Sequence, residues 1–363
     1  SRPARLSAVE RLRVEVLQTA AVVLAAHDSL SAAVSADRLL LLALQTRDPR
    51  YMAAALQLQA FFLTALSPHE EEPIARLYGL AQRYAQQLGD DPVLHGWIEL
   101  DIGTGYAYAR EMSWGRSREH LQKALELLRG CRGVRYFVDA THIFLLMFPT
   151  SELSREARTA VQVVEEALSL GRVWCAGMVA CSSTMVRLAT GDAAGVARHM
   201  LEVQACWTAQ EEMAFVDSAV LRASASIAHY HREPETALSA YEQVWQRYER
   251  SMLGRVAGIR RNMHSGRGLL SIAVARRTPD PRRRQALRAC AEADRHAVVK
   301  YTKDPELPPV LALDASLALE RGDRAAALAV LRRAARKAPT GAAFDDVPRL
   351  CARRRLGQLL GGE

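Results

Sequence analysis

The sequence contains few aromatic residues and no long apolar run. Only 6% of its 363 residues are aromatic, whereas Ala, Leu and Arg are abundant. These three residues are strong helix formers, and segments with the alternating pattern of strands are absent. The most apolar stretches, Leu39–Leu44 and Ile143–Phe148, are far shorter than the roughly 18 residues that a membrane span needs. We therefore predict an all-α protein without transmembrane helices.

Cysteine motifs and a signal-peptide pattern are also missing. No two cysteines have the spacing of a zinc or redox site, so we expect small, reduced core residues. Glu15 interrupts the apolar N-terminal segment, where a signal peptide carries no charge. These absences predict a cytoplasmic protein without a bound metal or cofactor. The six cysteines are Cys131, Cys175, Cys181, Cys206, Cys290 and Cys351.

Catalytic motifs are absent as well. The sequence has no HExxH, no GxxxxGKS/T phosphate loop and no HRD or DFG element of a kinase. His229 and His231 are two positions apart on a predicted helix, so they point to opposite sides and do not share a metal. We predict that the protein is not an enzyme. The alternative is an enzyme on an α/α scaffold, which would need a deep pocket with converging acids or histidines.

Proline and glycine divide the chain into helical segments. Prolines mark helix starts at Pro49, Pro73, Pro92, Pro234, Pro281 and Pro305, and glycines mark helix ends at Gly89, Gly130, Gly171, Gly191 and Gly322. The short connections predict antiparallel neighbours. About seventeen helices are expected, over 6–25, 30–46, 49–66, 71–88, 92–110, 116–129, 134–148, 152–169, 172–189, 193–208, 211–231, 234–250, 253–276, 281–300, 306–320, 323–337 and 346–360.

Several predicted turns resemble one another. Three turns each join an apolar helix to an amphipathic one: Thr190-Gly191-Asp192, Arg232-Glu233-Pro234 and Arg321-Gly322-Asp323. A weaker copy is the turn from Arg110 to Arg116, which ends in Trp114-Gly115-Arg116. A small residue shortly after each turn would let two helix axes approach closely. The pattern is typical of tetratricopeptide hairpins. We predict one degenerate tetratricopeptide-like α-solenoid over 1–363, with N-terminal helices in 1–90, the clearest repeats in 91–250 and basic repeats in 251–363.

The positive charge is concentrated near the C-terminus. Residues 251–363 contain 23 Lys/Arg against 11 Asp/Glu, whereas residues 1–250 contain 25 against 29. The arginines of this region either form a solvated surface or contact an acidic peptide, a phosphate group or a neighbouring domain. We do not expect nucleic acid as the main partner, because no aromatic residues interleave with the arginines. The candidate binding arginines are Arg260, Arg261, Arg282, Arg283 and Arg284, and Arg353-Arg354-Arg355 is a further basic cluster.

Two aromatic groups are candidates for lining a concave binding groove. The first is Tyr106, Tyr108 and Trp114, and the second is His229 and Tyr230 with Trp245 and Tyr248. Aromatic residues at these spacings also fill the cores of helical repeats, so both interpretations stay open. Solenoids bind extended peptides or small effectors on their concave side.

The segment Asp28–Gln59 resembles part of large bacterial eukaryote-like serine/threonine kinases, in which a kinase domain is fused to a STAND-type signal-transduction ATPase and a C-terminal tetratricopeptide-like region. The matching features are Asp28, Arg38, Leu39–Leu44, Asp48-Pro49, Tyr51, Ala54, Leu56 and Gln59. Similar features are Leu170-Gly171-Arg172 before the helix that ends at Gly191-Asp192, Cys206-Trp207 with Phe215, and Arg353 to Glu363. The chain lacks the kinase and ATPase motifs themselves, so the resemblance implies the sensor arm alone.

The resemblance implies a regulatory role in bacterial signalling. Such an arm would bind a protein segment, a neighbouring domain or a small effector and so control an attached or partner ATPase or kinase. The alternative is a transcription-linked module whose basic C-terminal face contacts nucleic acid, with a steep dependence of affinity on salt.

Overall fold

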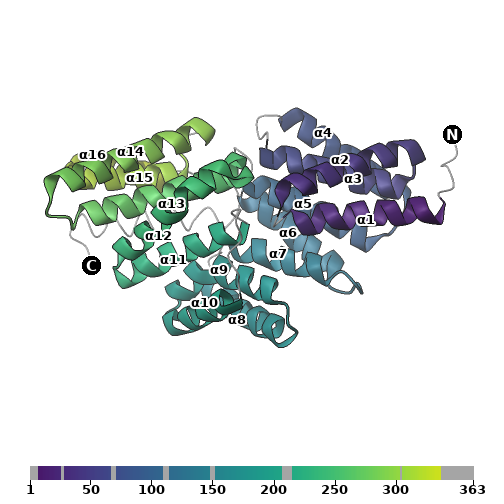
Figure 1. The fold of residues 1–363 in the computed structure, drawn as a ribbon, viewed down its shortest axis with the longest axis horizontal. Coiled ribbons are helices and arrows are strands. Elements are labelled where there is room, and N and C mark those ends of the chain that lie inside the picture. The colour runs from purple at the N-terminus through teal and green to yellow at the C-terminus, as the bar shows by residue number, and fades with distance from the viewer. Residues whose placement is uncertain are drawn as a thin grey trace. The chain divides into compact units, whose positions relative to one another are not determined.

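The computed structural model describes residues 7–25, 28–66, 71–108, 114–147, 152–206, 215–302 and 305–336. These residues form α-helices and one 3₁₀ helix, η1, without a strand (Figure 1). The predicted all-helical fold is confirmed. The helices are α1 (Ala8–Leu24), α2 (Ser29–Thr46), α3 (Pro49–Leu66), α4 (Glu71–Gln87), α5 (Pro92–Tyr108), α6 (Trp114–Leu128), α7 (Arg135–Met147), α8 (Leu153–Ser169), α9 (Val173–Ala189), α10 (Ala193–Cys206), α11 (Phe215–His231), α12 (Pro234–Arg250), η1 (Met252–Arg255), α13 (Ala257–Ala275), α14 (Pro281–Thr302), α15 (Pro308–Glu320) and α16 (Arg324–Arg336).

Helices that follow one another in sequence pack as pairs. The main pairs are α1 with α2, α3 with α4, α5 with α6, α8 with α9, α13 with α14, and α15 with α16. This pairing is consistent with an α-solenoid. Within the described residues, no helix is both long and apolar enough to cross a membrane.

The chain divides into two compact units, 1–145 and 146–363, here called the N-terminal and C-terminal units. The core of the N-terminal unit is formed mainly by the inner faces of α1 to α6. In the C-terminal unit, α9 is buried along nearly its whole length and packs against α8, α10 and α11. Helix α13 similarly contacts α11, α12, α14 and α15.

Two of the predicted turns are Gly-Asp turns with the same backbone geometry. Gly191 and Gly322 have positive φ angles of 86° and 79°, in the left-handed region that glycine adopts without steric cost. The following amides of Asp192 and Asp323 donate to carbonyls five residues back. Their side chains then cap the next helix, because Asp192 Oδ1 accepts from the Gly195 amide at 3.1 Å and Asp323 Oδ1 from the Ala326 amide at 2.8 Å.

The third turn reaches this geometry without glycine. Arg232 has φ 61°, and the Glu233 amide donates to the Ala228 carbonyl at 2.8 Å. The fourth predicted turn is wrong in part, because Trp114, Gly115 and Arg116 already belong to α6. The positive φ after α6 is at Gly133 rather than at Gly130, which the sequence had marked as the helix end.

One helix begins later than predicted. The segment expected as 253–276 contains η1, then the extended residue Val256, and only then α13. A Cβ atom on Gly254 would lie 2.9 Å from the Tyr248 carbonyl oxygen, so the chain passes close to the end of α12 at this glycine. Pro73 and Pro305 were predicted as helix starts but are not the first residues of their helices, because α4 begins at Glu71 and α15 begins at Pro308. The predicted helix 346–360 lies outside the described residues.

Candidate functional site

The last described helix, α16, has one apolar face and one basic face. Ala327 and Leu331 are buried, and Leu331 forms a small cluster with Ala315 of α15. The helix contains four arginines and no acidic residue. Because Arg332 and Arg336 are four positions apart, they project from the same side, away from the buried residues.

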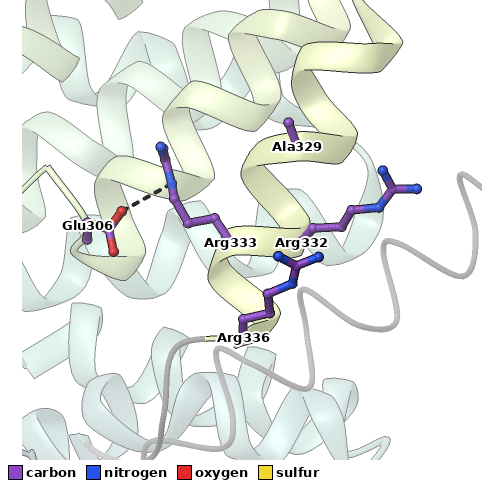
Figure 2. Close-up of a pocket in the computed structure, with 5 residues that line it drawn as sticks. All are labelled: Glu306, Ala329, Arg332, Arg333 and Arg336. Atoms are coloured by element: carbon purple, nitrogen blue, oxygen red, sulfur yellow. Dashed lines mark ion pairs between the residues drawn. The ribbon is translucent and has the colours of Figure 1, made fainter.

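A pocket of about 540 Å³ lies against this basic face (Figure 2). It is lined by Glu306, Ala329, Arg332, Arg333 and Arg336. Arg333 Nε lies 3.2 Å from Glu306 Oε1, and Figure 2 shows these two side chains turned toward each other. Arg332 and Arg336 extend away from Glu306, and neither makes an ion pair or hydrogen bond to any described residue.

The chemistry of this pocket favours an anion. Arg332, Arg333 and Arg336 lie within two helical turns, and Glu306 balances only one of them. Guanidinium groups present planar pairs of N–H donors that fit a carboxylate or a phosphate with two parallel hydrogen bonds. An incoming anionic group would therefore find, on one side of a helix, two cations that no described residue pairs. We call Arg332 and Arg336 the arginine pair.

The arginines predicted from the sequence have several different environments. Arg282 and Arg283 are exposed at the start of α14. Arg284 donates from Nε and Nη2 to the Thr278 carbonyl at 3.1 and 2.7 Å, so it joins α14 to the preceding turn. Arg261 is buried, and Arg260 lies 3.8 Å above the ring of Tyr301. The cluster Arg353 to Arg355 lies outside the described residues.

The predicted aromatic candidates belong to different units. In the N-terminal unit, Tyr106 stacks on His120 with 5.6 Å between ring centroids. In the C-terminal unit, His229 and Tyr230 are exposed at the end of α11, and Tyr230 contacts His231 edge to face. Trp245 and Tyr248 are buried, in keeping with the core interpretation. The side chains of Tyr108 and Trp114 lie outside the described residues.

A buried polar cluster links α12, α13 and α14. Asp294 is fully buried and accepts from Arg267 Nε at 2.8 Å and Nη2 at 2.6 Å, while His264 Nδ1 lies 2.6 Å from its Oδ1. The Arg267 guanidinium also lies 3.3 Å above the ring of Trp245. Burial raises the pKa of the nearby Cys290 thiol, so Cys290 is a poor nucleophile. This cluster is satisfied within the protein and joins three helices.

A second polar cluster lies in the N-terminal unit. Glu99 is within 2.6 Å of both His120 Nδ1 and Lys123 Nζ. Burial acts to raise the pKa of Glu99, but the hydrogen bonds from His120 and Lys123 outweigh it and lower the pKa. Two positions on, burial raises the pKa of Asp101 to about 7, against the smaller effect of a 2.8 Å hydrogen bond from Gln57 Nε2. The acidic side chains of Asp294, Glu99 and Asp101 thus have different electrostatic surroundings.

Sequence reasoning missed the arginine pair. The signal was present as Arg332-Arg333-Ala334-Ala335-Arg336 in the predicted helix 323–337, whose single acid, Asp323, lies at its start; the candidate arginines were instead assigned to clusters such as Arg282-Arg283-Arg284. In the described residues, no group of three His, Cys, Asp or Glu side chains could hold a metal ion. Comparison with known protein families and with curated proteins finds no match for this sequence.

Proposed function

We propose that the chain is a non-enzymatic interaction module whose C-terminal unit binds an acidic segment of a partner protein at the pocket on α16. The observation that carries this proposal is the arginine pair, two exposed guanidinium groups on one side of a helix without a partner among the described residues. Charged groups arranged in this way raise both the association rate and the selectivity for an oppositely charged partner.

An acidic protein segment fits better than nucleic acid. A nucleic-acid surface neutralises many phosphates and usually stacks bases on aromatic side chains. The described residues that line the pocket are three arginines, the acidic Glu306 and Ala329, with no aromatic residue among them. Single carboxylates that reach Arg332 and Arg336 would suffice to pair with their charges.

We further propose that such binding regulates an ATPase or kinase in bacterial signalling, with a tetratricopeptide-like array as the scaffold. The support is the resemblance of Asp28–Gln59 to the sensor region of kinase and STAND-type ATPase fusions, together with helices that pack in adjacent pairs. A regulatory arm needs a surface that recognises another domain, and the basic pocket offers one.

The binding proposal is tested with a short fluorescein-labelled polyglutamate peptide and fluorescence anisotropy. We expect the double variant R332Q/R336Q to lose at least about tenfold in affinity, equivalent to about 1.4 kcal/mol. The matched control is R282Q/R283Q, which removes the same charge from exposed positions on α14 and should change affinity by about twofold or less.

Two outcomes would contradict the binding proposal. Equal losses in both double variants would show that only the overall charge matters. Tighter binding to a DNA duplex than to the peptide, with a steep loss between about 50 and 200 mM salt, would favour the transcription-linked module instead.

The regulatory part is tested separately by using the chain as bait and measuring the activity of any co-purified ATPase or kinase. We expect its rate to change when the wild-type chain is added and to change less with R332Q/R336Q. A captured enzyme whose rate is the same with and without the chain would contradict regulation.

A further inference from the structure

Helices α1 and α2 expose an apolar surface that their own unit does not cover. In α1 the exposed apolar residues are Val9, Leu12, Val16 and Val23, and in α2 they are Leu30, Val34, Leu41 and Leu44. Their exposed fractions run from 42% for Val34 to 72% for Val9. Surface hydrophobic residues are common singly, but eight of them on one hairpin form a patch of the kind that marks an interface.

The spacing of these residues places them in two stripes. In each helix they are three, four or seven positions apart and fall within about 80° on a helical projection. The buried residues of the hairpin, such as Val14 and Ala21 in α1 and Leu39 in α2, lie on the other side and face the core of the N-terminal unit. The two stripes therefore form the outer face of the hairpin, which we call the α1–α2 face.

The α1–α2 face carries larger apolar side chains than the inner side of α2. The inner side has Ala32, Ala36 and Ala43 beside Leu39, whereas Leu41 and Leu44 are outside. The last described helix is different, because α16 exposes arginines and no large hydrophobic residue.

We propose that the α1–α2 face binds the same face of a second copy of this chain. The two helices contain three arginines and three acidic residues, and Asp28 in the connection between them adds one negative charge. The hairpin therefore has only one excess negative charge, so two copies would repel each other little. Charges of both signs are present in nearly equal number, so a strongly acidic or basic partner would find no large excess of complementary charge there. A two-fold arrangement also pairs a surface with itself, which is the commonest symmetry of protein oligomers.

The apolar spacing suits helix-to-helix packing between the copies. Val9, Leu12, Val16 and Val23 follow a heptad pattern, in which the apolar side chains of one helix fit between those of a partner helix. Each copy supplies α1 and α2, which pack against each other, so the interface contains four helices, two from each copy (Figure 1 shows the α1–α2 hairpin of one copy). Specific interfaces bury on the order of 1,200 Å² or more in total, and a two-fold interface buries the same face of both copies.

The test is the mass of the full chain in solution, measured by light scattering over a concentration series. We expect a mass of about 80 kDa, twice the 40.1 kDa of one chain, at high concentration. The variant L12E/L41E should weaken association at least a hundredfold without loss of helical circular dichroism, because both positions are exposed. The matched control M185E/L201E changes two exposed apolar residues of the C-terminal unit and should leave the dimer unchanged.

Three results would overturn the proposal. They are a chain that stays at the mass of one copy throughout the series, a dimer that survives L12E/L41E, and a dimer that M185E/L201E disrupts equally. Peptide binding at the α16 pocket is a separate measurement, so failure of the dimer leaves the proposed function standing.

Discussion

A negative charge on Asp101 is unfavourable in its buried surroundings. It is buried, and Gln57 Nε2 donates to its carboxylate, but Gln57 Oε1 is buried without a partner among the described residues. The neighbouring Tyr78 hydroxyl donates to the Asp101 backbone carbonyl at 3.2 Å. Burial raises the pKa of Tyr78, and also raises that of Tyr136 to about 12, with the nearby Asp101 charge as a second cause in both. Protonated Asp101 therefore suits this site better than the carboxylate.

The raised pKa makes Asp101 a source of pH-dependent stability. The folded pKa of about 7 lies above the ordinary 3.8, so between these values the folded state binds more protons than the unfolded chain. The free energy of unfolding therefore falls as pH rises through this window. We expect Asp101→Asn to stabilise the chain at pH 8.5 by up to about 4 kcal/mol relative to the wild type, because about three pKa units are removed. Its amide could also donate to Gln57 Oε1.

Urea unfolding at pH 5 and pH 8.5 tests this expectation. The advantage of Asp101→Asn should grow between the two pH values. The control is Asp37→Asn, because Asp37 accepts a hydrogen bond from Gln59 at the same 2.8 Å distance but is exposed. An Asp101→Asn effect that does not vary with pH would show that Asp101 is ionised at little cost.

Asp294 shows the opposite case, a buried carboxylate that is well paired. Removing it leaves Arg267 and His264 without their shared acceptor in a mostly buried site. We expect Asp294→Ala to lower the free energy of unfolding by about 3–5 kcal/mol. The comparison is Asp314→Ala, which breaks a similar two-bond contact with Arg295 nearer the surface and should cost about 1 kcal/mol or less. Similar losses in the two variants would contradict a special role for burial.

Among the elements, the turns offer a paired test of backbone strain. Arg232 occupies the left-handed region at φ 61°, which costs a non-glycine residue about 1 kcal/mol, whereas glycine occupies it at Gly191. We expect Arg232→Gly to raise the free energy of unfolding by about 0.5–1 kcal/mol and Gly191→Ala to lower it by about 1 kcal/mol. Thermal unfolding of both variants checks this, and a loss of stability in Arg232→Gly would show that its side chain matters more than its backbone.

The helices were largely predictable because their start and stop signals are local. Four predicted prolines are first helical residues, and the ends of sixteen predicted helices lie within about four residues of the observed ones. The late start of α13 could not be predicted, since it depends on how closely Gly254 approaches the Tyr248 carbonyl of another element. Contacts of this kind depend on packing and leave no pattern in the sequence.

The pairing of charges was much less predictable than the helices. Arg284 looked like a binding arginine in the sequence, yet the structure joins it to the Thr278 carbonyl. Arg332 and Arg336 were not among the predicted binding residues, yet no residue that the structure describes pairs with them. A sequence shows where charge is abundant, whereas its availability depends on partners from other elements, such as Glu306 for Arg333.

At the scale of the whole molecule, the two units present surfaces of different chemistry. The N-terminal unit has the largely apolar α1–α2 face, and the C-terminal unit has the basic pocket on α16. Salt should act differently on the two, because it screens charge pairs but leaves apolar association intact or strengthens it. Raising the salt concentration would thus separate self-association from the capture of an acidic segment.

The alanine-lined inner side of α2 has a consequence for how such a chain varies during evolution. Ala32, Ala36 and Ala43 allow α2 to lie close to its neighbours, so larger side chains at these positions would force the helices apart. The bulky outward leucines fill no space inside their own unit. Related sequences should therefore keep the small residues and vary the large ones freely, unless a second copy of the chain places selection on them.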